Sequence, residues 1–211
     1  NNPVKDLTSS ALACNVDNNP VPTTINVSPG DEITFIWGHD QIDDDIIASS
    51  HKGPVVVYIA STSSQGSGNV WLKLAEDGYA DGSWAIDKLI ANRGRHSVTL
   101  PNLVAGEYLL RPEILALHEA DAVYTQNPNR GIQLYMECIQ IKIVSTTGTV
   151  GLSQGVSFPG TYKYSDPGIH FDIYNSDPNS YIIPGPAVWT PGTSSSASTA
   201  ATQNFFFVFF C

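Results

Sequence analysis

The stretch from residue 131 to residue 143 constrains the fold more than any other part of this chain. The apolar residues of its first half recur at every second position: Ile132, Leu134, Met136 and Cys138. This is the period of a β-strand with one buried face, and it places Gln133 and Tyr135 on the opposite face. After Cys138 the apolar positions shift by one, to Ile139, Ile141 and Ile143. We therefore expect a bulge, or a change in the layer that covers the strand, near Cys138.

Other segments also have strand patterns and are separated by loops rich in Pro and Gly. We expect strands over residues 31–37, 55–59, 96–100 and 106–111. The continuous apolar run at 55–59 is typical of a strand buried on both faces. Pro112 lacks a backbone N–H, so it predicts an edge or a break after residue 111. Short strands joined by such turns predict an all-β protein, an antiparallel β-sandwich with long loops and little helix.

The length of 211 residues is one that all-β proteins often fold as a single domain. Charged residues make up 14% and hydrophobic residues 42%, which is typical of a folded protein. We place the domain at residues 1–190, followed by a Ser/Thr-rich linker and an apolar tail over residues 191–211. The tail is too short for a membrane span, which needs about 20 apolar residues.

The chain is acidic, with 20 Asp and Glu against 10 Lys and Arg and a formal net charge of −10. This balance argues against nucleic acid and anionic membranes as partners, because their phosphates require a basic surface. A neutral partner such as a polysaccharide is compatible with the charge, although the charge does not select one.

The three cysteines match no zinc-site spacing, because the chain contains no C-x-x-C pair. Cys14 and Cys138 are compatible with a disulfide or with two buried thiols, and an oxidising compartment favours the disulfide. Few Lys and abundant Gly, Pro, Ser and Thr are typical of a secreted β-protein, so we expect an extracellular location. Asn26 begins the sequon Asn-Val-Ser and is a candidate N-glycosylation site.

No catalytic motif stands out from spacing alone. The five histidines form no H-x-x-x-H or H-x-H pair: His39, His51, His96, His118 and His170. The chain also lacks the G-x-S-x-G turn of serine hydrolases. Its carboxylates at Glu113, Glu119 and Asp121 have no pattern that marks a glycosidase pair.

Six segments nevertheless occur in an order similar to that of one protein family. In chain order they contain Asn2-Pro-Val with Cys14-Asn15, His51-Lys-Gly-Pro54, Gly106-Glu-Tyr-Leu-Leu-Arg111 with Ala116-Leu-His118, Gln133-Leu-Tyr135 with Cys138, Phe158-Pro-Gly160 with Asp166-Pro-Gly168, and Tyr181-Ile-Ile-Pro-Gly-Pro186. From residue 1 to about residue 190 the chain resembles the fungal lytic polysaccharide monooxygenases of auxiliary activity family nine, formerly glycoside hydrolase family sixty-one.

The resemblance implies an immunoglobulin- or fibronectin-like β-sandwich that carries one copper ion. In the family, the metal is held by a histidine brace, in which a terminal histidine supplies its amine and imidazole. His51 matches the second brace histidine and Tyr135 the axial tyrosine. His118 and Gln133 match the outer residues that hydrogen-bond the reacting oxygen species, so with Tyr135 they are the candidate catalytic residues. Imidazole and amine nitrogens suit copper.

The resemblance also implies a substrate and its binding surface. A flat face of the domain would lie on cellulose or a related β-glucan, and Tyr181 matches an aromatic residue that stacks on the sugars. Cys14 and Cys138 match a family disulfide. The reaction implied is oxidative chain cleavage by a monomeric enzyme, which uses an external electron donor and oxygen or hydrogen peroxide.

Residue 1 is Asn rather than His, and the family segment that precedes Asn-Asn-Pro-Val and holds the brace histidine does not appear in this sequence. We therefore expect an N-terminally incomplete domain with half a brace and little brace-type copper affinity. One alternative is a non-catalytic secreted glycan-binding or surface protein derived from the same family. A second is a structural sandwich domain in which His51 and Tyr135 have no metal.

Overall fold

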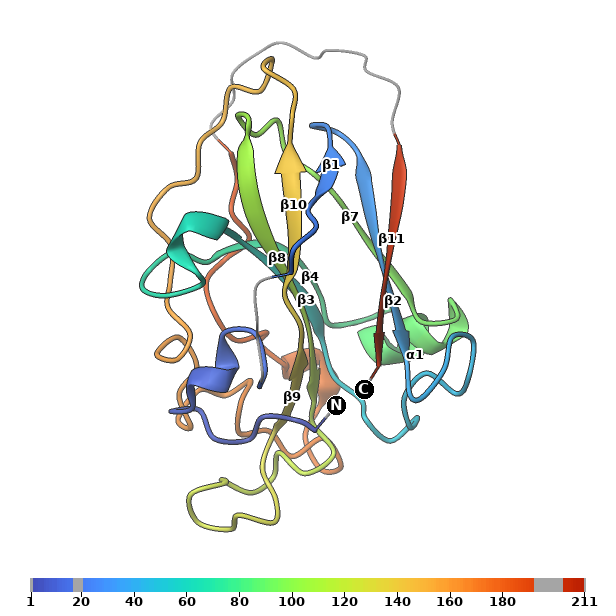
Figure 1. Cartoon of the computed structure of the whole chain (residues 1–211). Helices are drawn as coiled ribbons and strands as arrows, with labels where there is room; N and C mark the ends of the chain where they lie inside the picture. Colours follow the sequence, from blue (N-terminus) through green and yellow to red (C-terminus); the bar gives the residue numbers. More distant parts are fainter. Residues whose placement is uncertain (1, 17–20, 192–202, 211) are drawn as a thin grey trace.

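The computed structural model describes residues 2–16, 21–191 and 203–210, and within them two β-sheets face each other (Figure 1). The larger sheet has the strand order β1-β10-β8-β3-β4, with β9 pairing β8 at the end of β8. Its strands are β1 (Ile25–Val27), β3 (Val55–Ser61), β4 (Leu72–Asp77), β8 (Gly106–Ala116), β9 (Gln133–Met136) and β10 (Ile139–Ile143). The predicted all-β sandwich is confirmed.

The smaller sheet has the order β11-β2-β7 and is made of β2 (Glu32–Gly38), β7 (Arg95–Thr99) and β11 (Asn204–Phe210). β2 pairs antiparallel with β7 and parallel with β11. The sheet therefore includes residues on both sides of the boundary predicted at residue 190. Within the linker and tail predicted over residues 191–211, residues 192–202 and 211 lie outside the described residues, and the domain boundary stays a prediction.

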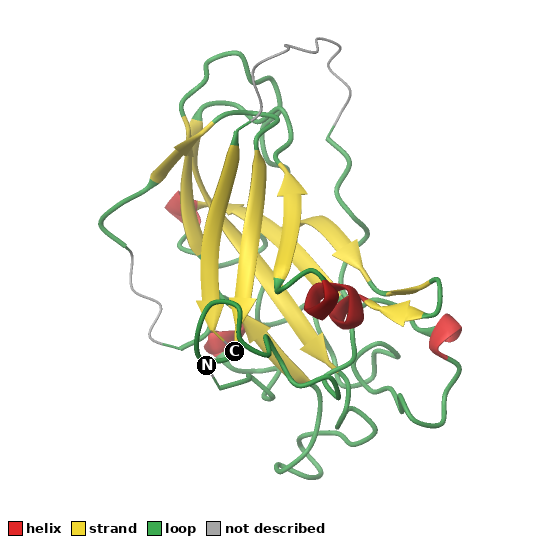
Figure 2. Cartoon of the chain, turned by 90° about the vertical axis from the view of Figure 1, so that its right-hand side faces the viewer, coloured by secondary structure: helices red, strands yellow, loops and turns green. Residues whose placement is uncertain are grey.

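Helical structure is minor, as Figure 2 shows. The α-helix α1 (Ala85–Ala91) begins where the Trp84 N–H donates to the Asp87 carboxylate. It follows the hairpin of β5 (Tyr79–Ala80) and β6 (Ser83–Trp84). Short 3-10 turns occur at η1 (Ser10–Leu12), η2 (Thr62–Ser64) and η3 (Pro178–Ser180). In the part of the chain that the structure describes, no helix has the length and apolar character that a membrane crossing requires.

The larger sheet is buried on both faces, because two apolar clusters lie against it. One cluster fills the space between the sheets and includes Phe35, Trp37 and Val57. The other covers the opposite face and joins the N-terminal segment to the loops that contain Phe158 and Phe171. The strand β3 contributes to both clusters, as its continuous apolar run predicts.

The parity change at Cys138 comes from a change of covering layer. Met136 lies opposite Glu113 and Ile139 lies opposite Leu110, so the register along β8 is the same on either side of Cys138. No extra residue is inserted, and the predicted bulge is absent from this pairing. Leu134 and Met136 face the outer cluster, whereas Ile141 and Ile143 face the cluster between the sheets.

The edge or break predicted after residue 111 is wrong for the strand that contains Pro112. β8 continues through Pro112, which lies opposite Val57 of β3, to Ala116. On the other side of β8, the pairing with β9 and β10 is interrupted at residues 137 and 138, where the Glu137 N–H donates to the Pro112 carbonyl. Because Pro112 has no backbone N–H, the second hydrogen bond between residues 112 and 137 cannot form, and the strand pairing is interrupted there.

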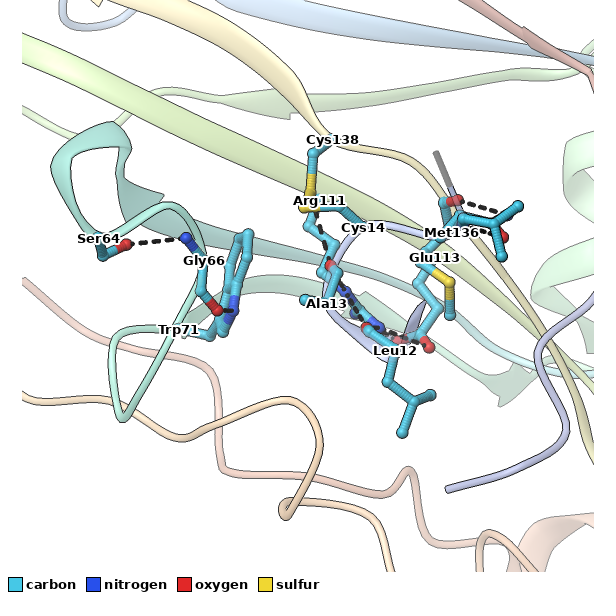
Figure 3. Close-up of a disulfide and its surroundings, with 12 residues drawn as sticks. Leu12, Ala13, Cys14, Ser64, Gly66, Trp71, Arg111, Glu113, Met136 and Cys138 are labelled. Atoms are coloured by element: carbon cyan, nitrogen blue, oxygen red, sulfur yellow. Dashed lines mark hydrogen bonds and ion pairs between the residues drawn. A yellow bond between two sulfur atoms is a disulfide. The ribbon is translucent and has the colours of Figure 1, made fainter. Parts of the chain in front are cut away.

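A disulfide joins Cys14 to Cys138, with Cα atoms 5.1 Å apart (Figure 3), so the alternative of two buried thiols is excluded. Arg111 holds the same segment, since it donates to the carbonyl oxygens of Leu12 and Ala13 at 2.8 Å. The guanidinium also forms a two-pronged ion pair with Glu113, at 2.8 and 3.0 Å, and both side chains are fully buried. The N-terminal segment is thereby fixed against the outer face of the larger sheet.

Candidate functional site

The pairing between β3 and β8 continues beyond both strands and brings two predicted site residues together. The Leu115 N–H donates to the Pro54 carbonyl, and the Leu117 N–H donates to the Lys52 carbonyl at 2.8 Å. The same register places His51 opposite His118. Their ring centroids are 4.0 Å apart. Two histidines that are distant in the sequence thus become neighbours through strand pairing.

Gly53 allows this extension of the ladder. A Cβ atom at position 53 would clash with the carbonyl oxygen of Leu115. The backbone between His51 and Pro54 can therefore approach the end of β8 only with glycine here. An ion pair between Lys52 and Asp87 of α1 holds the same segment from its other side.

His51 and His118 are half-buried imidazoles that favour the neutral form. The pKa of His51 is lowered to about 4, mainly by burial and also by the neighbouring His118 and by His39, while Glu119 acts in the opposite direction. Burial also lowers the pKa of His118, against the opposing effect of Glu119. Neutral imidazole is the form that binds a metal ion, because its second ring nitrogen keeps a lone pair.

The strand β9 places Gln133 and Tyr135 beside the histidines. β9 pairs with the end of β8, so that Tyr135 lies opposite Ile114. The Tyr135 and His51 ring centroids are 6.1 Å apart. The Tyr135 hydroxyl donates to Gln133 Oε1 at 2.8 Å. The structure therefore brings together His51, His118, Gln133 and Tyr135, the four residues that the sequence assigned to the metal site and its surroundings.

Sequence reasoning gave no role to Glu119, although it completes this hydrogen-bonded group. Gln133 Nε2 donates to Glu119 Oε2 at 2.8 Å, and Lys5 Nζ donates to the same oxygen at 3.2 Å. Burial raises the pKa of this carboxyl, but the hydrogen bonds from Gln133 and Lys5 outweigh it and lower the pKa below its ordinary value. Lys5 reaches Glu119 because the adjacent Val4 pairs with Leu134 of β9.

His118 also contacts the loop that follows residue 168. Its backbone carbonyl accepts a hydrogen bond from the Tyr174 hydroxyl at 3.1 Å. The Phe171 N–H donates to the Ala120 carbonyl at 2.9 Å, which ties the two loops together. The buried Nδ1 atom of His118 finds no hydrogen-bond partner among the described residues. It is thus a ring nitrogen that a bound group can still engage.

The two tyrosines of this region differ in exposure. Tyr181 packs edge-on against Trp84 and Phe171, and its hydroxyl donates to the Gly168 carbonyl at 2.9 Å. Burial raises the pKa of Tyr181 well above its ordinary value. Tyr174 is 68% exposed. Sequence reasoning missed Tyr174, and the available signal was its position a few residues after the Asp166-Pro-Gly168 segment.

The candidate glycosylation site and the candidate metal ligands have different surroundings. Asn26 lies exposed on β1, opposite Lys142 of β10.

At the candidate metal site, His51 offers a neutral imidazole and Tyr135 a phenol oxygen, and both donor types fit copper. Residue 1 lies outside the described residues. No group of three or more His, Cys, Asp or Glu side chains in those residues is arranged to hold a metal ion.

Comparison with known proteins gives consistent matches. The model of Auxiliary Activity family 9 (formerly GH61) matches residues 1–181. An AA9 family lytic polysaccharide monooxygenase A from Armillaria gallica is 53% identical over 197 residues, which are 92% of this chain and 79% of that protein. A protein of the same name from Aspergillus fumigatus is 55% identical over 94% of this chain. The chain spans 55% of that relative's length.

Solved structures also match this chain. The structure named CvAA9A superposes with a TM-score of 0.85 at 48% identity, covering 89% of this chain and 86% of that one. A cellulose-active polysaccharide monooxygenase from M. thermophila superposes with a TM-score of 0.70 at 30% identity, covering 90% of this chain and 84% of that one. This chain therefore belongs to Auxiliary Activity family 9, the lytic polysaccharide monooxygenases formerly classified as GH61.

Proposed function

We propose that this domain cleaves cellulose or a related β-glucan oxidatively, with copper as its cofactor. One observation carries the proposal: His51, His118, Gln133 and Tyr135 lie together at the ends of β3, β8 and β9, in a chain of this family. The name of the M. thermophila relative supports cellulose as the substrate class. An acidic surface is compatible with a neutral glucan.

His51 and Tyr135 are the residues that would hold the copper ion. A copper ion held there, with an external electron donor, would supply the redox chemistry by which oxygen or hydrogen peroxide oxidises a glycosidic carbon. The His118 ring lies beside that of His51, tilted against it, and its lowered pKa favours a neutral imidazole at this position. Gln133 holds the phenol proton of Tyr135 on its Oε1 side, which keeps that proton away from the ligand position.

Tyr174 supplies the exposed ring for contact with the glucan. A planar aromatic side chain can stack on a sugar ring with little loss of conformational entropy. Tyr174 is exposed and tied to the His118 carbonyl, so a sugar on this ring would lie near the catalytic residues. Tyr181 remains a predicted substrate-binding residue, and its packing on Trp84 and Phe171 suits support of the surface.

The proposed substrate also suggests where the protein acts. Insoluble glucan is extracellular, so we propose secretion, with Asn26 as a glycosylation site and the Cys14–Cys138 disulfide formed in an oxidising compartment. We propose a monomer. We also propose His51 as the imidazole ligand that the described residues contribute to the copper site.

Calorimetric titration with Cu(II) tests the metal site. His51→Ala should weaken Cu(II) binding relative to the wild-type chain, whereas His39→Ala should not, because His39 is exposed and pairs with Asp45. Equal binding by the two variants would contradict the role of His51.

Incubation with cellulose and a reductant tests the reaction. Oxidised oligosaccharides that require added copper and His51 would support the monooxygenase. Binding to cellulose without oxidised products would instead favour a non-catalytic glycan-binding protein.

A further inference from the structure

Glu119 occupies a fixed position at the base of a loop. The Gly131 N–H donates to the Glu119 carbonyl at 3.1 Å, which closes the loop of residues 120–130. The side chain of Glu119 lies between Gln133 and Lys5, and Lys5 also donates to the Asn129 carbonyl at 2.9 Å. The carboxylate is therefore held by side chains from β9 and from the N-terminal segment.

The two ends of the Gln133 amide have different partners. Its Nε2 atom donates to Glu119, and its Oε1 atom accepts from the Tyr135 hydroxyl, both at 2.8 Å. A carboxylate can only accept hydrogen bonds, so the end of the amide that faces Glu119 must be the NH2 group. The carbonyl end is then turned toward Tyr135, and the phenol must donate to it.

The surrounding structure keeps Gln133 within reach of Glu119. Gln133 is the first residue of β9 and lies opposite Ala116 at the end of β8. The next residue, Leu134, pairs with Val4 on the other edge of β9, with hydrogen bonds of 2.8 and 3.0 Å. With the backbone fixed on both edges, the hydrogen bonds to Glu119 and Tyr135 determine the position of the side chain and which end of its amide faces each partner.

We propose that Glu119 is a positioning residue, which fixes the amide of Gln133 with its oxygen toward Tyr135 and so directs the phenol proton away from the metal position. The inference rests on the proposed function, since it concerns the residues around the copper site. Glu119 itself touches neither metal nor substrate in this scheme. Its effect passes through the hydrogen bonds of Gln133 and Tyr135, which are cooperative in a partly buried site.

NMR of the side-chain amide of Gln133 in the metal-free chain tests this proposal directly. A charge-assisted hydrogen bond should shift one Gln133 NH2 proton downfield. Glu119→Gln has the same shape but can present either end of its own amide, so the downfield position should be lost. Lys5→Met should retain it, because this variant leaves the bond between Glu119 and Gln133 in place. Glu107→Gln, which removes an exposed carboxylate paired with Lys142, is the matched control and should also retain it.

The outcomes separate this inference from the proposed function. Unchanged Gln133 amide resonances in Glu119→Gln would overturn the role of Glu119, provided that the Leu134 backbone resonance shows β9 intact. A shift in Glu119→Gln but not in Glu107→Gln would support it. Because these spectra need no copper, they decide the role of Glu119 even if the chain fails to bind the metal. In the Cu(II)-loaded chain, the electron paramagnetic resonance spectrum should change in Glu119→Gln and stay constant in Glu107→Gln.

Discussion

His51 lies opposite His118, with ring centroids 4.0 Å apart, because the ladder between β3 and β8 continues past the ends of both strands. The hydrogen bonds that extend it join Leu115 to Pro54 and Leu117 to Lys52. The histidine pair is therefore a product of sheet register, and its geometry depends on the backbone between residues 51 and 55.

Gly53→Ala should disrupt this pair. The added methyl group would clash with the Leu115 carbonyl oxygen, and a forced backbone shift of this kind costs about 1–3 kcal/mol of unfolding free energy. Gly151→Ala is the matched control, because a Cβ there meets no atom. Urea unfolding should show a lower midpoint for Gly53→Ala alone. The same midpoint in the two variants would contradict the close approach at Gly53.

Much of the fold follows from local patterns, since β2, β3 and β7 lie close to the predicted ranges. The alternation around Cys138 was also informative, but it left open whether a bulge or a new covering layer explains it. That choice depends on the segment around Leu12 and on the loops near Phe158, which cover one end of the strand from distant parts of the chain. No short window of sequence contains this information.

Some residues of the candidate site could also be assigned from the sequence, and others could not. His51, His118, Gln133 and Tyr135 could be assigned through the family resemblance, because each lies in a distinctive segment. Glu119 and Tyr174 could not, because their roles come from contacts across the fold with Gln133 and with the His118 carbonyl. A carboxylate or a tyrosine in a loop has no periodicity that reveals its partner.

The buried ion pair of Arg111 and Glu113 should be sensitive to loss of either partner. Glu113→Gln would leave the Arg111 guanidinium buried without a counter-charge, which costs about 3–5 kcal/mol. Glu107→Gln removes a carboxylate from a half-exposed pair with Lys142, for which about 0–1 kcal/mol is expected. Chemical denaturation of both variants checks the difference. Similar losses in the two would show that the Arg111 pair contributes no more than a surface pair.

Stability should decrease as the pH falls below about 6.5, the ordinary pKa of histidine. Burial lowers the pKa of His51 to about 4, and it also lowers those of His96 and His118. Between these values and 6.5 the unfolded chain binds more protons than the folded one, so the unfolding free energy rises with pH across this window. Urea midpoints measured from pH 4 to pH 7 should show this slope.

A variant can separate the contribution of His96 to this slope. The His96 ring stacks on Phe35 and is partly buried. Burial lowers its pKa, and the charge of Asp77 opposes this decrease. His96→Phe keeps an aromatic ring in place and removes one titrating group. Its unfolding free energy should therefore depend less steeply on pH than that of the wild-type chain. An unchanged slope would contradict the contribution of His96.

Tyr174 and Tyr181 should respond differently to truncation. Tyr174→Ala should weaken binding to cellulose by about 1 kcal/mol, or about fivefold in Kd, because an exposed stacking ring is lost. Tyr174→Phe keeps the ring and loses only the hydrogen bond to the His118 carbonyl, so binding should be largely retained. Tyr181→Ala removes the contacts with Trp84 and Phe171 and should instead lower the unfolding free energy by about 1–3 kcal/mol. Pull-down isotherms on cellulose, combined with urea unfolding, measure both effects. If Tyr181→Ala weakens binding at full stability while Tyr174→Ala does not, the contact surface is centred on Tyr181, as the family resemblance implies.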